Sequence, residues 1–218
     1  MQPTEPTLRR WFTCKCPMLD RYIVPLIKPA VDAIARKLVR AGVQADHVTL
    51  LAFALGMAAA LCIALQSYWP GAALILLSRL CDALDGAVAR QTQATDAGGY
   101  LDITLDFLFY ASIPLAFAVA NPRTNALPAA FLLAAFIGTG SSFLAFATLA
   151  AKRGITHLAQ PNKSFYFLGG LTEATETLLF FLAMCVWPRY FAQMASLFTA
   201  LCCVTIASRI YGGWRSLR

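Results

Sequence analysis

Residues 81–106 read CDALDGAVARQTQATDAGGYLDITLD, and they place four aspartates in two segments that are otherwise apolar enough to enter a membrane. The four are Asp82, Asp85, Asp102 and Asp106. An ionised side chain near the centre of a bilayer costs roughly 2.5–3.5 kcal/mol, so four of them cost on the order of 10 kcal/mol together. Positive charge must offset this cost. The stretch therefore predicts that cations bind between the carboxylates.

The composition of the whole chain supports a membrane location. Of its 218 residues, 59% are hydrophobic and only 13% are charged, with a mean hydropathy of +0.62. A soluble domain carries roughly a quarter charged residues. The short alternating segments of a transmembrane strand barrel are absent. The sequence thus predicts an all-α integral membrane protein.

Six apolar segments are each long enough to cross a hydrocarbon core about 30 Å thick. Their short connections contain Pro70-Gly71, Asn121-Pro122, Pro128 and Pro188. The predicted transmembrane helices cover residues 48–66, 71–90, 99–120, 128–151, 170–187 and 191–211. Residues 43–218 are therefore expected to form one six-helix transmembrane domain that includes the aspartates.

Two segments precede this domain. Residues 1–18 show no clear period and are predicted to form a flexible tail. Residues 19–42 put basic side chains mostly on one helical face and apolar side chains on the other. The apolar face holds Ile27, Val31, Ile34 and Leu38. This pattern predicts an amphipathic helix lying in the membrane interface. A soluble amphipathic helix is the alternative, which the nearby first span disfavours.

Basic residues are distributed unevenly along the chain. Eight of them lie between Arg9 and Arg40, before the first predicted span. With the N-terminus in the cytoplasm, the outer connections hold only Arg123 and Arg189. The positive-inside rule therefore predicts that both chain ends and the aspartates lie on the cytoplasmic side. The N-terminal cluster lacks the cleavage site of a targeting signal and suits an anionic leaflet, so membrane lipids rather than nucleic acid are the expected partner.

The spacing of the aspartates predicts one shared site. Asp82 and Asp85 are three residues apart on one predicted helix. Asp102 and Asp106 are four residues apart on the next. Each pair projects from a single helical face, and the short connection makes the two helices antiparallel. Oxygen ligands favour Mg²⁺ or Mn²⁺ over zinc, and two such ions about 3.5–4 Å apart can clamp a phosphate diester or a pyrophosphate.

Small residues and two arginines accompany the aspartates. Gly86 and Ala89 follow Asp82 by one and two turns, which predicts a shallow groove where a substrate approaches the backbone. Arg90, at the helix end, is placed to contact phosphate oxygens. Arg79, one turn before Asp82, is predicted to neutralise buried carboxylates.

The whole pattern resembles the signature of the CDP-alcohol phosphatidyltransferases. It reads Asp-x-x-Asp-Gly-x-x-Ala-Arg from residue 82, then seven residues, then Gly-x-x-x-Asp-x-x-x-Asp from residue 98. All eight defining positions of the family are filled. The predicted interfacial helix, the six spans and the cytoplasmic ends also match the family. Within the family, the chain most resembles bacterial inner-membrane members. This resemblance does not identify the acceptor alcohol.

By this resemblance, the protein transfers a phosphatidyl group from CDP-diacylglycerol to a small polar alcohol and releases CMP. Asp82, Asp85 and Asp102 would be the main ligands of two Mg²⁺ or Mn²⁺ ions, with Asp106 also close to the second ion. Asp106 would be the general base that deprotonates the acceptor hydroxyl. The CDP pocket would be bordered by Asp82, Gly86, Ala89, Arg90 and Gly98. The resemblance also implies a homodimer.

The segment before the first span, Ala45-Asp46-His47-Val48-Thr49, departs from a Pro-Asn-x-x-Thr pattern of the family and retains only its threonine. In the family this segment touches cytidine, which makes Asp46 and Thr49 candidates for the CDP pocket. Asp46 is equally well placed to be a helix N-cap. Asp96 is predicted to cap the third span rather than to bind metal.

The predicted connection between the fourth and fifth spans holds the candidates for acceptor binding. Lys152, Arg153 and Lys163 lie there, although the positive-inside rule alone accounts for them. Members of the family bind the polar acceptor near this loop, and these cations favour a phosphorylated polyol such as glycerol phosphate. Glu173 and Glu176 favour an uncharged or amine-bearing alcohol, or serve as partners of the helix dipole.

Two other functions stay open on the sequence alone. In one, soluble CDP-choline or CDP-ethanolamine is the donor and diacylglycerol accepts the group. In the other, the chain is an ion or solute transporter, because intramembrane acids often mark a transport pathway. Against transport, the sequence shows no internal repeat and the acids cluster at one end. Formation of CMP separates the two classes.

Overall fold

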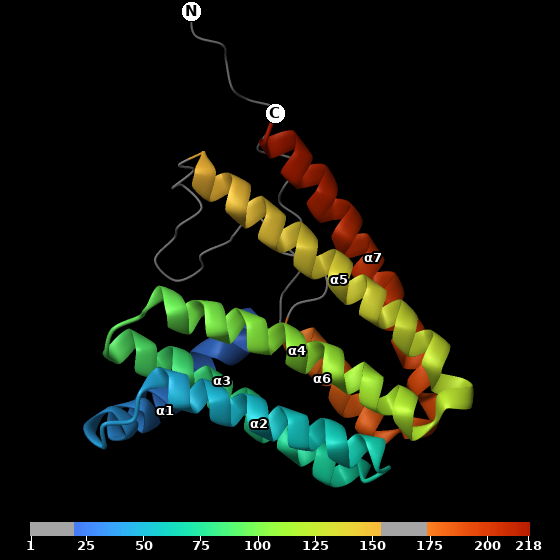
Figure 1. Cartoon of the computed structure of the whole chain (residues 1–218), viewed down its shortest axis with the longest axis horizontal. Helices are drawn as coiled ribbons and strands as arrows, with labels where there is room; N and C mark the ends of the chain where they lie inside the picture. The colour runs from blue at the N-terminus through green and yellow to red at the C-terminus, as the bar shows by residue number, and fades with distance from the viewer. Residues whose placement is uncertain (1–19, 154–173) are drawn as a thin grey trace, which may run out of the picture.

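The computed structural model describes residues 20–153 and 174–218, with side chains from Leu26 onward, and the described chain is helical throughout (Figure 1). The helices are α1 (Asp20–Arg40), α2 (Ala45–Ala64), α3 (Tyr68–Gln91), α4 (Asp96–Ala120), α5 (Pro122–Lys152), α6 (Ala174–Val186), the 3-10 helix η4 (Pro188–Tyr190) and α7 (Phe191–Ser216). The predicted tail over residues 1–18 lies outside the described residues.

Four helical segments among the described residues are long and apolar enough to cross a membrane. They are Ala45–Ala64, Asp96–Ala120, Pro122–Lys152 and Pro188–Ser216. They coincide with four of the predicted spans. The predicted span at 71–90 corresponds to α3, but charged residues such as Arg79 and Asp82 exclude it from this apolar set. The predicted span at 170–187 corresponds to α6, of which 13 residues are described. The full set of six spans stays a prediction.

Two helices begin before the spans predicted for them. The helix α3 begins at Tyr68 rather than at residue 71, and α5 begins at Pro122 rather than at residue 128. Proline fits the first turn of a helix because its missing N–H would have no partner there. Pro128 lies inside α5, where apolar helices of membrane proteins tolerate proline more readily than soluble ones do. The prolines that were read as breaks therefore belong to the helices.

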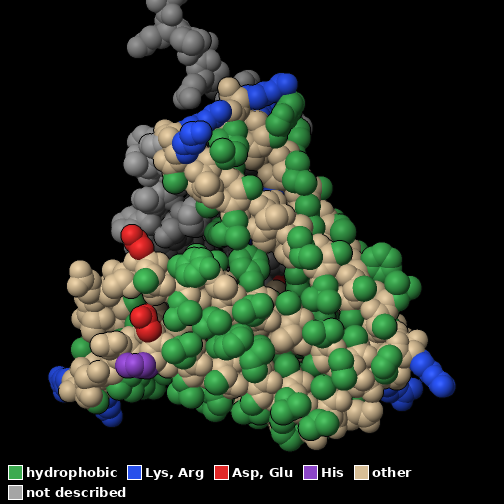
Figure 2. All heavy atoms as spheres, viewed as in Figure 1, with side chains coloured by type: hydrophobic (Ala, Val, Ile, Leu, Met, Phe, Trp, Pro, Cys, Tyr) green, Lys and Arg blue, Asp and Glu red, His purple; other side chains and the backbone are tan. Residues whose placement is uncertain are grey.

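The helices pack as two connected groups. Helices α2, α3 and α4 form one group, and α5 pairs with α7 along a direction that diverges from α4 (Figure 1). Stacked aromatic rings join the groups, with Phe117 of α4 and Phe191 of α7 separated by 4.6 Å between ring centres. Apolar side chains also cover most of the outer face visible in Figure 2, with lysines and arginines at its edges. This distribution suits a bundle surrounded by lipid.

Helix α1 packs on the outer side of α3. Its buried Val31 and Ala35 lie in one apolar cluster with Leu84 and Val88. The predicted apolar face is therefore split, because Ile27 and Ile34 remain exposed rather than buried with Val31. The basic side chains that α1 leaves exposed are Lys28, Arg36, Lys37 and Arg40. This contact braces the turns of α3 that carry Asp82 and Asp85.

A glycine sets how closely α2 approaches α4. Gly56 is buried, and a Cβ atom placed on it would lie 2.5 Å from Cδ2 of Phe109 and 3.2 Å from Oγ of Ser78. Ser78 in turn donates a hydrogen bond of 2.7 Å to the carbonyl oxygen of Ala52. Close helix approach at small residues is a common device of membrane bundles.

We therefore expect Gly56→Val to destabilise the protein, by about 1–3 kcal/mol, because the added atoms overpack the junction. The Tm in detergent would fall accordingly. Ala54→Val is the matched control, since Ala54 lies on the exposed side of the same helix. Equal Tm values for the two variants would contradict this reading of the α2–α4 contact.

Candidate active site

A short turn between α3 and α4 brings the two aspartate pairs together. Helix α3 ends at Gln91, and Thr95 is the N-cap of α4, where its hydroxyl accepts a hydrogen bond of 3.0 Å from the N–H of Gly98. The prediction that Asp96 caps this helix was wrong, because Thr95 occupies that position and Asp96 lies in the first turn. The turn leads α3 into α4, and each of the two helices packs mainly on α2 rather than on the other.

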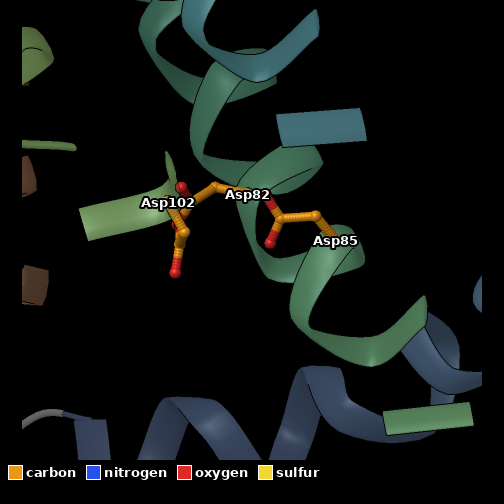
Figure 3. A group of neighbouring side chains, drawn as sticks. All are labelled: Asp82, Asp85 and Asp102. Atoms are coloured by element: carbon orange, nitrogen blue, oxygen red, sulfur yellow. The ribbon is translucent and has the colours of Figure 1, made fainter. Parts of the chain in front are cut away.

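Three of the predicted aspartates form one cluster. Asp82 and Asp85 lie on adjacent turns of α3, with Asp102 opposite them on α4 (Figure 3). Each contributes a carboxylate oxygen, and these oxygens all lie within 4.8 Å of one another. Like charges this close repel unless a cation lies between them.

Asp85 gives independent support for a cation. Its side chain is buried, and its Oδ2 atom has no hydrogen-bond partner among the described residues. A buried carboxylate oxygen without a partner is costly, whereas a metal ion would satisfy it. The donor set consists of oxygen atoms alone, which suits Mg²⁺ or Mn²⁺. The residues present therefore fit a divalent ion.

Asp106 lies beside this cluster and has a different partner. Its Oδ1 accepts a hydrogen bond of 2.5 Å from Nη1 of Arg79. The same nitrogen lies 3.4 Å from Oδ1 of Asp82. The predicted pairing of Arg79 with the aspartates is confirmed, although the Asp82 and Asp106 side chains it contacts are half-buried rather than buried. Asp82 and Asp106 thus share one arginine, while Asp82 also belongs to the three-carboxylate cluster.

Helix α2 supplies one wall of the site. Thr49 is buried, and its hydroxyl donates a hydrogen bond of 3.1 Å to the carbonyl oxygen of Ala45. Together with Phe53 it lines a small recess whose other polar side chains are Arg79, Asp82, Asp102 and Asp106. Thr49 therefore lies at the edge of the aspartate site, and its place in a CDP pocket stays a prediction.

Asp46 approaches the start of α4. A Cβ atom added to Gly98 would lie 2.9 Å from Oδ1 of Asp46, so the glycine leaves room for this carboxylate. The alternative role of Asp46 as an N-cap was wrong, because Gln44 is the N-cap of α2 and the helix already begins at Ala45. The side chain of Asp46 points toward α4 instead.

The end of α3 carries the remaining candidates for the CDP pocket. A Cβ atom on Gly86 would lie 3.3 Å from Nη1 of Arg90, so the guanidinium lies over the glycine. Arg90 is exposed and Ala89 is half-buried. These residues follow Asp82 and Asp85 along the same helix and extend the site toward its end.

The described residues include only part of the predicted acceptor region. Lys152 and Arg153 are exposed at the end of α5, and Glu176 is half-buried in the first turn of α6. Lys163 and Glu173 lie outside the described residues.

The sequence analysis missed the aromatic residues that surround Arg79. Its Cζ atom lies 4.0 Å from the ring centre of Phe109 and 5.6 Å from that of Tyr110. A signal for them was present, since these residues follow Asp106 by three and four positions and so lie on the same helical face. The site is therefore a set of carboxylates with one arginine held against aromatic rings.

A comparison with known families finds one matching family model. Residues 43–208 match the model described as CDP-alcohol phosphatidyltransferase. The match extends from just before α2 into α7, so it includes every described helix that contributes to the site except α1.

Several known proteins are similar in sequence. The inner membrane protein YnjF of Escherichia coli (strain K12) is 51% identical over 201 residues, which cover 92% of this chain and 98% of YnjF. An archaetidylinositol phosphate synthase of Methanothermobacter thermautotrophicus is 42% identical over 85 residues, covering 38% of this chain and 42% of that protein. The archaetidylinositol phosphate synthase of Pyrococcus horikoshii is 32% identical over 100 residues, covering 45% of this chain and 53% of its own length.

Solved structures share the fold. The phosphatidylinositol phosphate synthase PgsA1 of Mycobacterium tuberculosis, with CDP-DAG bound, is 23% identical, with a TM-score of 0.62 over 84% of this chain and 93% of that one. The same enzyme in complex with manganese and citrate also gives a TM-score of 0.62 at 23% identity, over 84% of this chain and 88% of that one. At this identity the likeness shows the fold alone.

Proposed function

The chain belongs to the CDP-alcohol phosphatidyltransferase family, and on that premise we propose that it transfers a phosphatidyl group from CDP-diacylglycerol to a phosphorylated polyol, with release of CMP. The observation that carries the proposal is the convergence of the Asp82, Asp85 and Asp102 carboxylates within 4.8 Å, beside the Arg79–Asp106 ion pair. A site of this kind suits a reaction in which negative charge develops on phosphate oxygens.

We assign metal binding to the three clustered aspartates. Asp82, Asp85 and Asp102 would hold Mg²⁺ or Mn²⁺, and a second ion would lie toward Asp106. PgsA1, which shares the fold, has been solved with manganese, and this supports the choice of ion. Bound there, the ions would neutralise charge on the pyrophosphate of the donor.

Asp106 is assigned the role of general base. The acceptor hydroxyl would give its proton to a carboxylate oxygen of Asp106, and the hydroxyl oxygen would attack the phosphorus of the phosphatidyl group. The bond between that phosphorus and the bridging oxygen then breaks, and CMP leaves with this oxygen. The hydrogen bond from Arg79 holds one carboxylate oxygen of Asp106, which leaves the other to accept the proton.

The CDP group is assigned to the ends of α2, α3 and α4. The close approach of Asp46 to Gly98 and the position of Thr49 in the recess support this assignment. Gly86 and Ala89 would let the nucleotide approach the backbone of α3. Arg90, exposed at the end of that helix, would contact phosphate oxygens.

For the acceptor we propose a phosphorylated inositol or glycerol. The archaeal relatives are archaetidylinositol phosphate synthases, and PgsA1 is a phosphatidylinositol phosphate synthase, which favours an inositol phosphate. Lys152, Arg153 and Lys163 would bind its phosphate as a group of cations near the cytoplasmic end of the bundle. Glu173 and Glu176 would then contact hydroxyl groups of the polyol.

We also propose that the chain crosses a bacterial inner membrane six times, with both chain ends and the site on the cytoplasmic side. YnjF, an inner membrane protein, matches this chain nearly end to end. Exposed Trp69, Trp187 and Tyr190 lie at the helix ends opposite the aspartates, where aromatic residues commonly meet the membrane interface. Exposed Tyr211 and Trp214 lie near the cytoplasmic end of α7. Helix α1 would rest in that interface, and the active form would be a homodimer.

The test is CMP release by the purified protein in detergent, with CDP-diacylglycerol and Mg²⁺ or Mn²⁺. Inositol phosphate, glycerol phosphate, inositol and glycerol are added one at a time. We expect release that depends on a phosphorylated acceptor and exceeds that of its unphosphorylated partner by at least tenfold, since charge-assisted contacts are lost without the phosphate.

Two outcomes would contradict this function. In the first, CMP is released from CDP-choline or CDP-ethanolamine with diacylglycerol, but not from CDP-diacylglycerol. The donor would then be the soluble CDP-alcohol, and diacylglycerol would be the acceptor. No CMP from any pair, together with ion uptake by vesicles that contain the protein, would support a transporter.

A further inference from the structure

Arg79 is a charged side chain set deep in the bundle. It lies on α3 one turn before Asp82, and its side chain is only 12% exposed. Its Nη1 atom faces one carboxylate from each of two helices, Asp82 of α3 and Asp106 of α4. A charge in such a place is maintained only where its partners are fixed.

Neighbouring side chains fix the position of the guanidinium group. It lies over the ring of Phe109 at 4.0 Å, where the face of the ring attracts a cation. Its Nη2 atom lies 3.3 Å from Oγ of Ser78, and that hydroxyl is anchored to the backbone of α2. The arginine is therefore held on several sides rather than reaching freely into solvent.

The fixed cation and the three-carboxylate cluster share Asp82. On one side, Asp82 converges with Asp85 and Asp102. On the other, it faces Arg79, which also holds Asp106. A divalent ion near Asp82 and Asp106 would consequently lie close to the positive charge of Arg79 and would compete with it for both carboxylates.

We propose that Arg79 is a positioning residue that acts as a built-in counter-cation: it limits the site to one tightly bound divalent ion until the donor pyrophosphate arrives. This inference rests on the proposed function. The four carboxylates carry four negative charges, of which Arg79 and one divalent ion compensate three. A second ion would make the site net positive, and the negative charge of the pyrophosphate then favours its entry.

The order of binding follows from this balance. Asp82, Asp85 and Asp102 would hold one ion with no substrate present, and the site would take a second only together with the nucleotide lipid. In the same arrangement Arg79 keeps Asp106 oriented until the acceptor arrives. Arginine suits this role because its guanidinium stays charged and lies against the ring of Phe109.

The experiment measures Mn²⁺ binding to the full-length protein in detergent by the electron paramagnetic resonance of free Mn²⁺. The wild type is expected to bind one ion tightly without substrate and two with CDP-diacylglycerol. Arg79→Gln is expected to bind two ions without substrate, the second at least about tenfold more tightly than in the wild type, because the repelling charge is gone. Arg79→Lys retains the charge and should keep the wild-type count.

Arg189→Gln is the matched control. Arg189 also lies over an aromatic ring, that of Tyr190 at 4.9 Å, but at the opposite ends of the helices. The Arg189→Gln variant should bind Mn²⁺ as the wild type does. Equal binding by Arg79→Gln and wild type, or a second tight ion in the wild type without CDP-diacylglycerol, would overturn the proposal.

The same titrations separate this inference from the proposed function. If Asp102→Asn leaves Mn²⁺ binding unchanged, the ion does not bind between these aspartates. That result would overturn both the proposed function and this inference. If Mn²⁺ binding is weakened by Asp102→Asn but is the same in Arg79→Gln and in the wild type, only the inference about Arg79 is overturned. The wild-type comparison with and without CDP-diacylglycerol needs no variant, so a folding defect in Arg79→Gln cannot hide the answer.

Discussion

The Asp106→Asn variant is expected to retain the Mn²⁺ ion held by Asp82, Asp85 and Asp102 and to bind CDP-diacylglycerol, while its rate of CMP release falls by roughly 10²–10⁴-fold, the usual contribution of a general base. Asparagine has the shape of aspartate, and its side-chain oxygen can still accept the hydrogen bond that Nη1 of Arg79 donates to Oδ1 of Asp106. What asparagine cannot do is take a proton from a hydroxyl group. The loss should therefore fall on kcat rather than on KM.

The measurement is CMP release under saturating CDP-diacylglycerol, using the acceptor that gives the highest rate with the wild type. Thr104→Val is a matched control, since Thr104 lies on the same helix between Asp102 and Asp106, and its hydroxyl hydrogen-bonds only within the helix, to the carbonyl oxygen of Tyr100. It should keep at least about half of the wild-type rate, because a surface substitution of this kind has small effects. Normal CMP release by folded Asp106→Asn would exclude Asp106 as the base.

The positions of the aspartates could be predicted because local rules determine them. The spacings of Asp82 from Asp85 and of Asp102 from Asp106 place each pair on one helical face, and a short turn brings together the ends of the two helices that carry them. Only three of the four carboxylates form the cluster, because Arg79 pairs with Asp106. The spacing of the aspartates alone does not contain that distinction.

Other features depend on contacts between distant segments. The recess at Thr49 and the approach of Asp46 to Gly98 exist because α2 lies close to α4, which Gly56 and Phe109 permit. No sequence period near Asp46 encodes that approach, which explains why its role as an N-cap looked equally good. The prolines misled for a different reason, since the first turn of a helix accepts them as readily as a loop does.

For the acceptor region, the sequence predicted only the kind of side chains present, not which of them bind the acceptor. Lys152 and Arg153 are exposed at the end of α5, where the positive-inside rule places cations regardless of substrate. The aspartates are different, because four acids in apolar helices have no such general explanation. Functional residues are thus easiest to recognise in a sequence where physical chemistry would otherwise exclude them.

The second large effect is expected from Asp102→Asn, which should lower both the affinity for Mn²⁺ and the rate of CMP release by about 100-fold or more, since it removes one of the three converging carboxylates. Asp96→Asn is the matched control on the same helix. Asp96 is exposed in the first turn of α4 and lies outside the three-carboxylate cluster, so its variant should bind Mn²⁺ normally.

Thermal unfolding distinguishes loss of a ligand from loss of the fold. At a concentration 100 times its Kd, Mn²⁺ should stabilise the wild type by about 2.7 kcal/mol, which raises the Tm by roughly 5–10 °C for a chain of this size. Asp102→Asn should show little of this rise. Without Mn²⁺, however, its Tm should equal or exceed that of the wild type, because one source of repulsion within a partly buried cluster of like charges is gone. A misfolded variant would instead melt lower under both conditions, and an equal Mn²⁺-induced rise in both proteins would show that the ion does not bind between these aspartates.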